Sequence, residues 1–343
     1  MKPHRWPRIC LSLIALPLLS LVAVGCGSGS AVTSTAVAAG ATSGQIAPAS
    51  AKPQQVSILL NWFADVERGG YVNMALPGEG TKYGLDVKVI PGSPSVQTIP
   101  QVASGQAQFG VAQADQILQA RAKGVPVVQI FGGWNRFPTC LMWHSNQHIS
   151  GFADMNGRTL AVDLAGAYWL YLKWRYHLNN VKVIPYQGLA VFKQQQTLVH
   201  QCFIEAEPWQ ENHELGVPTD ALLVSSTGYD PYANGLFTTE TMIKEHPDLV
   251  KKVVAAAQNG WSTFLANPAP VRADVAKLTK DTDLKQFDHT IDLLRQPGWF
   301  ADPLGAMTKA RWNTLAAQLK AAGVIPSTLD PSAAWTDQFI PTH

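Results

Sequence analysis

Beyond residue 54, short apolar runs alternate with segments of helical periodicity. The first four apolar runs predict strands over residues 56–60, 86–90, 108–111 and 126–131. Between them, residues 96–103 predict one helix, and a second should start at Asp115 as N-cap and end at Gly124. This alternation is typical of a mostly parallel sheet covered by helices.

A second set of elements follows the first. It predicts helices over 168–177 and 192–199, and strands over residues 140–144, 159–162, 181–184, 202–205 and 221–224. After Gly235 the chain becomes mainly helical, with an apolar helix face formed by Leu249, Val253, Ala257, Trp261 and Phe264. Two α/β lobes and a closing helical segment predict a clamshell, whose ligand would bind outside the carboxyl ends of the strands.

The lobes should be discontinuous in sequence. We expect residues 55–135 and 230–343 to form lobe 1, and residues 136–229 to form lobe 2. The chain would then cross between the lobes near residues 134–137 and again near 227–234. A folded part of about 290 residues is long enough to give each lobe its own core.

The N-terminus has the features of an export signal. Lys2, Arg5 and Arg8 precede an apolar stretch over residues 9–24, and small residues lead into Cys26. We predict a lipoprotein signal peptide over residues 1–25 and a lipid-anchored Cys26, the alternative being ordinary secretion. Residues 26–54 are rich in small and polar residues and predict a flexible tether to the membrane.

Charge and cysteine content narrow the choice of partners. The chain has 26 Lys and Arg residues against 24 Asp and Glu, a formal charge of +2, and loss of the signal peptide would change it to −1. A nearly neutral body gives no reason to expect nucleic acid as a partner. The two cysteines of the body, Cys140 and Cys202, could form a disulfide outside the cytoplasm or remain buried thiols.

Three passages resemble a family of ABC-transporter solute-binding proteins, the one that contains thiamine-pyrimidine, riboflavin, taurine, aliphatic-sulfonate and nitrate binders. They are residues 60–63 with the following 69–71, residues 102–111, and residues 152–162. The resemblance implies a type II-like periplasmic-binding-protein clamshell, a monomer that delivers a small molecule to an ABC permease. Two departures lie in the first passage, where Asn61 replaces the usual Asp and Glu67-Arg68 replaces an Asn-His pair.

Candidate ligand-binding residues follow the predicted strand ends. Aromatic faces bind planar or apolar ligands, and strand-end carboxylates and amides orient them. The aromatic candidates are Trp62, Phe63, Tyr71, Tyr168 and Trp169. The polar candidates are Asn61, Ser93, Ser95, Gln113, Asp115, Arg136, Glu205 and Glu207. Core packing, helix capping or plain solvation are the alternative roles for each of them.

The sequence favours binding over catalysis. It has no nucleophile elbow and no phosphate-binding Gly-Lys loop. His144 and His148 are four residues apart, but they lie at and after the end of a predicted strand and not on a predicted helix. We therefore expect no cofactor and no metal. The favoured ligand is an aromatic heterocycle, such as a pyrimidine, a thiamine precursor or a flavin-like vitamin precursor. An aliphatic sulfonate, taurine or nitrate is the alternative, and an extracytoplasmic enzyme on the same lobes is a third hypothesis.

Overall fold

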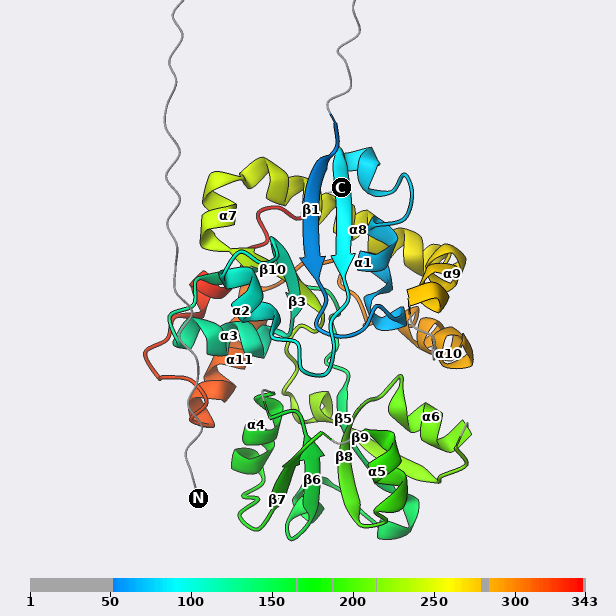
Figure 1. Ribbon diagram of the computed structural model, residues 1–343. Coiled ribbons are helices and arrows are strands. Elements are labelled where there is room, and N and C mark those ends of the chain that lie inside the picture. Colours follow the sequence, from blue (N-terminus) through cyan, green and yellow to red (C-terminus); the bar gives the residue numbers. More distant parts are fainter. Residues whose placement is uncertain (1–51, 165, 187, 214, 279–283, 342–343) are drawn as a thin grey trace, which may run out of the picture. The chain divides into compact units, whose positions relative to one another are not determined.

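A computed structural model describes residues 52–164, 166–186, 188–213, 215–278 and 284–341 (Figure 1). The predicted signal peptide, Cys26 and most of the tether lie outside the described residues. All described elements belong to one compact unit, Ser50–His343. Within these ranges, no helix combines the length and the apolar character that crossing a membrane requires.

The first sheet has five strands in the order β2-β1-β3-β10-β4 (Figure 1). They are β1 (Gln54–Leu59), β2 (Leu85–Ile90), β3 (Phe109–Ala112), β4 (Val127–Phe131) and β10 (Gly235–Thr239). Strand β1 pairs in parallel with β2 and β3, whereas β10 runs antiparallel to β3 and β4. Strands β1 to β4 therefore run in one direction, and only β10 opposes them.

The second sheet repeats this arrangement in the order β7-β6-β8-β5-β9. Its strands are β5 (Thr139–His144), β6 (Thr159–Val162), β7 (Lys182–Pro185), β8 (Leu198–Phe203) and β9 (Thr219–Leu223). Here β5 is the antiparallel strand, between β8 and β9. In both sheets the antiparallel strand is the first strand in the sequence after the chain crosses from the other sheet. The prediction of two mostly parallel sheets in two lobes is confirmed.

Helices cover both sheets. With the first sheet are α1 (Gly69–Met74), α2 (Thr98–Ala103), α3 (Ala114–Ala122), α7 (Glu240–Glu245), α8 (Pro247–Ala266), α9 (Ala269–Leu278), α10 (Leu284–Leu294) and α11 (Lys309–Ala321). With the second are α4 (Tyr168–Arg175), α5 (Leu189–Gln194) and α6 (Glu207–His213). Short 3-10 turns complete the described residues: η1 (Val66–Arg68), η2 (Gly80–Tyr83), η3 (Ser145–Gln147), η4 (Phe152–Met155), η5 (Val224–Thr227) and η6 (Pro331–Ala334).

The long helix α8 packs closely on α1, and its predicted apolar face is fully buried. Glycine makes this approach possible. A Cβ on Gly70 would lie 2.1 Å from the Trp261 ring, and a Cβ on Gly260 would lie 2.4 Å from the Gly70 carbonyl oxygen. Both positions therefore require glycine because neighbouring heavy atoms already occupy the space.

One predicted helix is wrong. Helix α5 ends at Gln194, whereas residues 195–199 were predicted to continue it, and Leu198 already begins β8. The predicted strand over 202–205 is the end of this longer strand. The polar run before Leu198 has good helix formers, but β8 pairs with β5 on one side and β6 on the other. Pairing along both edges of a central strand outweighs local helical preference.

The two cysteines of the body form a disulfide. Cys140 on β5 lies directly opposite Cys202 on β8, with their Cα atoms 4.9 Å apart. Met142 and Phe192 complete the small buried cluster around it. The bond joins two central strands of the second sheet and closes a loop with a sequence separation of 62 residues.

The two chain segments that join the sheets pair with each other. The Trp134 backbone N–H donates to the Ala233 carbonyl (2.7 Å), and the Ala233 N–H donates back to Trp134 (3.1 Å). Gly133 has a left-handed φ of 64°, and a Cβ there would lie 2.4 Å from the Ala233 oxygen. The crossings therefore form a two-stranded hinge whose close approach depends on glycine.

We expect reduction of the disulfide to destabilise the second lobe by about 2–4 kcal/mol, because the crosslink restricts the unfolded chain. Denaturant unfolding with and without dithiothreitol measures this difference. The reductant should leave a Cys140→Ala/Cys202→Ala double variant unchanged. Equal unfolding curves for oxidised and reduced wild-type protein would show that the bond adds no stability.

Candidate functional site

A cavity of about 660 Å³ lies between the two sheets. Residues that follow parallel strands line it: Asn61 after β1, Gln113 after β3, Asp163 after β6 and Tyr186 after β7. The carboxyl ends of the strands in both lobes therefore meet at one place, which is where open α/β sheets bind ligands. The volume lies within the range of small-molecule sites.

Seven of the predicted site residues line this cavity. They are Asn61, Trp62, Ser93, Gln113, Asp115, Tyr168 and Glu207. The lining also includes residues that were not predicted, among them Glu67, Arg68, Phe137, Tyr186, Gln201 and Phe203. A signal for two of them was present in the sequence, since Glu67-Arg68 departs from the Asn-His pair of the resembling family.

The other predicted site residues lie outside the cavity lining. Tyr71 is fully buried, and its hydroxyl donates to the Asn234 carbonyl (2.6 Å). Phe63 is 41% exposed and packs edge-on against Trp62. The Arg136 guanidinium lies 5.6 Å from the centre of the Trp299 ring, so it contacts lobe 1 at the hinge.

Ser95, Trp169 and Glu205 complete this group. The Ser95 hydroxyl lies 3.3 Å from that of Ser93 on an exposed loop. Trp169 is 8% exposed, and the Lys173 ammonium lies 5.8 Å from its ring centre. Glu205 is completely buried. Its position near a strand end was predicted, but it is not among the residues that line the cavity.

Aromatic rings from both lobes enclose the cavity. Trp62 of lobe 1 meets Tyr186 of lobe 2 edge to face, with ring centres 6.4 Å apart. Phe137, at the first crossing, packs at 6.3 Å against Tyr168. Aromatic faces of this kind offer stacking surfaces to a planar ligand.

Asn234 orders the lobe 1 wall of the cavity. This hinge residue has a left-handed φ of 49°, and its backbone N–H donates to Gln113 Oε1 (2.8 Å). Its side-chain oxygen accepts from Asn61 Nδ2 (3.1 Å), while Arg68 Nε donates to Asn61 Oδ1 (3.1 Å). The Asn61 amide is therefore oriented from both ends, with its Nδ2 donating to the hinge and its Oδ1 accepting from Arg68.

Gln201 orders the lobe 2 wall in a similar way. Its side-chain oxygen accepts from the Tyr168 hydroxyl and from the Asp163 backbone N–H, both at 2.6 Å. Two donors on one oxygen hold the start of α4 against the loop after β6. The lobe 2 wall is therefore preorganised, which lowers the entropy cost of binding a ligand.

Asp115 is a buried acceptor at the start of α3. Its carboxylate accepts from the Tyr229 hydroxyl (2.8 Å) and from the Gln116 backbone N–H (2.9 Å). Burial raises the pKa of Asp115 to about 6, and the charge of Asp163 adds to this, although the hydrogen bonds to the carboxylate oppose it. The carboxyl group therefore titrates near neutrality rather than in acid.

A second acidic group lies at the other end of the cavity. Arg68, 3% exposed, pairs with Asp65 (3.3 Å) and with Glu67. Burial raises the pKa of Glu67 to about 8 despite the opposing charge of Arg68. Glu207 accepts from the Phe203 N–H (2.7 Å) and the Tyr186 hydroxyl (3.4 Å), and burial raises its pKa as well.

The charges around the cavity are unbalanced. Four acidic residues line it, Glu67, Asp115, Asp163 and Glu207, against two basic residues, Arg68 and Lys123. Arg68 is already paired, and Lys123 is exposed. The cavity therefore favours a ligand that supplies hydrogen-bond donors or positive charge over one that carries an anion.

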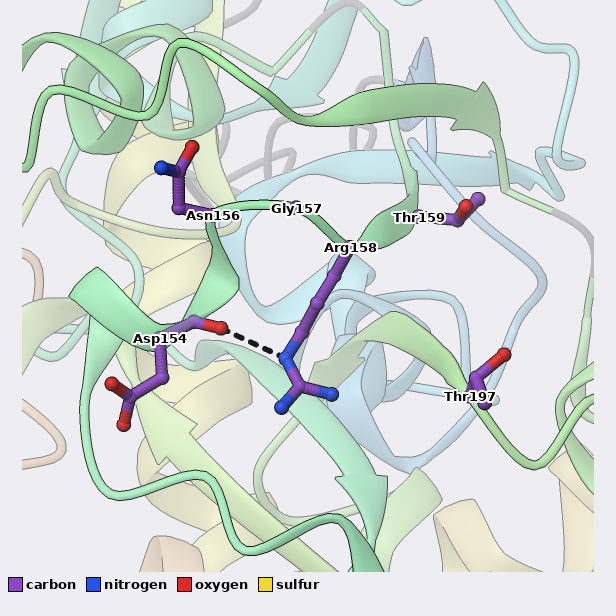
Figure 2. A pocket seen from close by; sticks show the side chains of 6 residues that line it. All are labelled: Asp154, Asn156, Gly157, Arg158, Thr159 and Thr197. Atoms are coloured by element: carbon purple, nitrogen blue, oxygen red, sulfur yellow. Dashed lines mark hydrogen bonds between the residues drawn. The ribbon is translucent and has the colours of Figure 1, made fainter.

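A separate hollow of about 400 Å³ lies at the opposite end of the second sheet (Figure 2). Asp154, Asn156 and Arg158 line it beside Thr159, the first residue of β6. Figure 2 shows Arg158 extended toward Asp154, whose carbonyl accepts from its Nε at 2.8 Å. The other donors of Arg158 are bound to Gln147. This hollow lies at the amino end of a strand, and its arginine is already hydrogen-bonded to Asp154 and Gln147.

The histidines, cysteines and acidic residues in the described ranges form no cluster of three suited to holding a metal ion. The acidic residues of the cavity are instead partnered by hydroxyl and backbone N–H donors.

Two α/β lobes, joined by a paired hinge around a cavity of ligand size, define a two-lobed solute-binding protein. The family model described as NMT1/THI5 like matches residues 81–270, more than half of the chain. The chain belongs to this family.

Individual relatives agree with this assignment. The riboflavin-binding protein RibY of Chloroflexus aurantiacus is 24% identical, over 94% of this chain and 96% of that protein. The periplasmic aliphatic sulphonate binding protein SsuA of Escherichia coli has a TM-score of 0.64 at 12% identity, covering 85% of this chain and 95% of its own. Likeness at this low identity establishes the fold.

Two other solved structures share the fold. The ligand-binding component of an ABC-type import system from Staphylococcus aureus has a TM-score of 0.61 at 10% identity, covering 83% of this chain and 97% of its own. The desulfurization enzyme DszB has a TM-score of 0.52 at 13% identity, with coverage of 83% and 97%. The fold thus serves import systems and also occurs in an enzyme.

We expect Asp115→Asn to gain stability relative to the wild type as pH rises from about 4.5 to about 7.5. The folded-state pKa of Asp115 is raised to about 6, so the protonated carboxyl stabilises the fold at low pH. The wild type loses this contribution as pH rises through about 6. The side chain of the Asn variant does not ionise, so the stability of the variant does not fall for this reason. Melting temperatures across this range measure the effect. Asp86→Asn, which changes an exposed residue of β2, is the control. A difference between variant and wild type that does not change with pH would contradict this assignment.

Proposed function

We propose that the protein is the extracytoplasmic solute-binding lipoprotein of an ABC importer and captures an aromatic heterocycle with hydrogen-bond donors, of the flavin or pyrimidine class. The observation that carries this proposal is the combination of aromatic rings and surplus carboxylates in one cavity between the lobes. In this proposal residues 55–135 and 230–343 form one lobe and 136–229 the other, and the protein acts as a monomer.

The geometry suits a flat ring. Trp62 and Tyr186 approach the cavity from opposite lobes, so a planar ligand between the lobes contacts both. Glu207 and Glu67 lie on the same side, where they accept hydrogen bonds from ring N–H or amino groups. The similarity to a riboflavin-binding protein over nearly the whole chain supports the same ligand class.

A sulfonate, taurine or nitrate ligand is the second candidate, because a sulfonate-binding protein shares the fold. The charges disfavour it. A buried anion needs cationic or N–H donors, but Arg68 already pairs with Asp65 and Glu67, and Arg136 lies over Trp299 at the hinge. The carboxyl groups of the cavity bring no positive charge to an anion in either protonation state.

An enzyme on the same lobes is the third candidate, since one neighbour is an enzyme. Nucleophilic catalysis needs a nucleophile with a base in hydrogen-bond reach. The described cavity lining holds neither histidine nor cysteine, and the neighbour of the Ser93 hydroxyl is another hydroxyl, Ser95. Capture without chemical conversion fits this lining best.

We expect Trp62→Ala and Glu207→Gln each to weaken the binding of riboflavin, or of an aminopyrimidine, by about tenfold or more. The first variant removes a stacking face, and the second replaces the carboxylate that accepts the ligand's donors. Isothermal titration calorimetry with riboflavin, an aminopyrimidine, thiamine, taurine and an alkanesulfonate measures the affinities.

Two matched controls accompany these variants. Trp174→Ala removes an indole that is 43% exposed on α4, and Glu240→Gln removes a carboxylate paired with Arg121 at the surface. Both should bind like the wild type. Tight binding of the sulfonates alone, with full affinity retained in Trp62→Ala, would overturn the ligand class and leave the solute-binding assignment intact.

The anchor has its own test. We expect Cys26→Ala to abolish lipidation, so that the protein is found in the soluble fraction or keeps its signal peptide. The motivation is the position of Cys26 after a charged and then apolar N-terminus. Metabolic labelling with a fatty acid, followed by membrane fractionation, separates the outcomes. Fatty-acid labelling of the variant equal to that of the wild type would contradict the proposed anchor.

A further inference from the structure

Four carboxyl groups from the two lobes gather around a single buried arginine. Lobe 1 supplies Asp65 and Glu67, beside Arg68. Lobe 2 supplies Glu205 and Glu207, just before and at the start of α6. Glu67, Arg68 and Glu207 line one cavity, and α10 of lobe 1 contacts both η1 and, through the Thr290 hydroxyl, the Glu205 carbonyl (3.0 Å), so the two lobes meet at this cluster.

Glu205 is the least compensated member of the cluster. Its side chain is 0% exposed, and neither carboxyl oxygen has a hydrogen-bond partner. Helix α10 covers it, because Thr290 donates from its hydroxyl to the Glu205 backbone carbonyl (3.0 Å). An ionised carboxylate without donors is very costly in such a place, whereas a protonated one is tolerated.

No donor from the described residues of the neighbouring elements is bound to the carboxyl oxygens of Glu205. On α10, Asp288 pairs with Arg272 and Asp292 lies near Arg295, both on exposed surfaces, while Lys285 is exposed. His289, from the same helix, stacks on Trp209 of α6 at 5.2 Å. On α6, Glu207 is bound by a backbone N–H and the Tyr186 hydroxyl. One guanidinium therefore faces four carboxyl groups.

We propose that closing the cleft around its ligand takes up protons, which Glu205 and Glu67 hold between the lobes. The two side chains come from opposite lobes, and α10 of lobe 1 contacts the Glu205 segment of lobe 2, so separating the lobes would expose both carboxyl groups and closing them buries both. Closing therefore favours their neutral forms. This inference rests on the proposed function, because capture by lobe closure drives the change.

The direction of the pH effect follows from this placement. Burial raises the pKa of Glu67 to about 8, and burial with the charge of Glu67 raises that of Glu205 well above its ordinary value. Protons are then bound more tightly in the closed form. Affinity should be highest at low pH and fall as pH rises through about 8, by up to about tenfold per pH unit for each proton taken up.

Calorimetry tests this uptake directly. Riboflavin is titrated into the whole protein near pH 7 in phosphate, HEPES and Tris buffers, whose ionisation enthalpies differ. A binding enthalpy that rises with the ionisation enthalpy of the buffer, with a slope of up to about two protons, one for each carboxyl group, is the expected result. Glu205→Gln should reduce the slope, whereas Glu240→Gln should keep it. Riboflavin binding with the same enthalpy in all three buffers would overturn the proposal.

A ligand-free measurement separates this inference from the choice of ligand. Absence of riboflavin binding would count against the proposed ligand class alone, because lower pH should favour the closed form without any ligand. Small-angle scattering and melting temperature are compared at about pH 6 and about pH 8.5. We expect wild-type protein to become more compact at the lower pH. The wild type could also be equally compact at the two pH values. In that case the melting temperature of Glu205→Gln minus that of the wild type should be larger at about pH 8.5 than at about pH 6.

Glu67→Gln provides a second variant if Glu205→Gln does not fold, and it should show the same trend. The proposal is overturned if the dimensions of the wild type do not change with pH and the melting-temperature difference between wild type and the folded variant is also constant. In that case the cluster binds the same number of protons in both forms.

Discussion

The hydrogen bonds of Asn234 connect the hinge to the ligand cavity, and the other parts of the site are arranged around them. This residue lies next to the paired crossing of Trp134 and Ala233. From one left-handed position it binds Gln113 through its N–H, Asn61 through its side chain and Tyr71 through its carbonyl. These bonds join the hinge directly to the first loop of lobe 1, which bears Asn61 and Trp62. Arg311 holds the crossings from outside, with bonds to Asn135 Oδ1 (2.6 Å) and the Asp230 carbonyl (2.7 Å).

The repeated topology explains why one cavity collects residues from so many strands. Each sheet receives one antiparallel strand directly after a crossing, β5 in lobe 2 and β10 in lobe 1. The remaining strands of each sheet end at the cleft, so their following loops face the same space. Carboxyl groups placed there are buried, which raises the pKa of Glu67 and Asp115. The same burial that shapes the cavity therefore also sets its protonation.

The sequence predicted the sheets well, since buried parallel strands consist of short apolar runs between turn residues. It failed at β8, where pairing with two neighbouring strands overrode the helix-forming residues before Leu198. Among site residues, Asn61, Trp62, Gln113 and Asp115 were found because they follow strand ends.

Side-chain direction could not be predicted in the same way. Tyr71 and Trp169 lie in helices and are buried outside the cavity lining, and Glu205 is buried outside it as well. Glu67 and Arg68 were missed because a 3-10 turn, which no hydrophobic period signals, brings them to the cavity.

The disulfide has a consequence for the order in which the protein matures. Thiols are kept reduced in the cytoplasm, so a bond between central strands of the second sheet forms only in an oxidising compartment. A chain awaiting export therefore has a second lobe without its crosslink, and a chain that has been exported has the bond in place. Oxidation then makes the step irreversible in practice, because the folded lobe buries both sulfur-bearing residues.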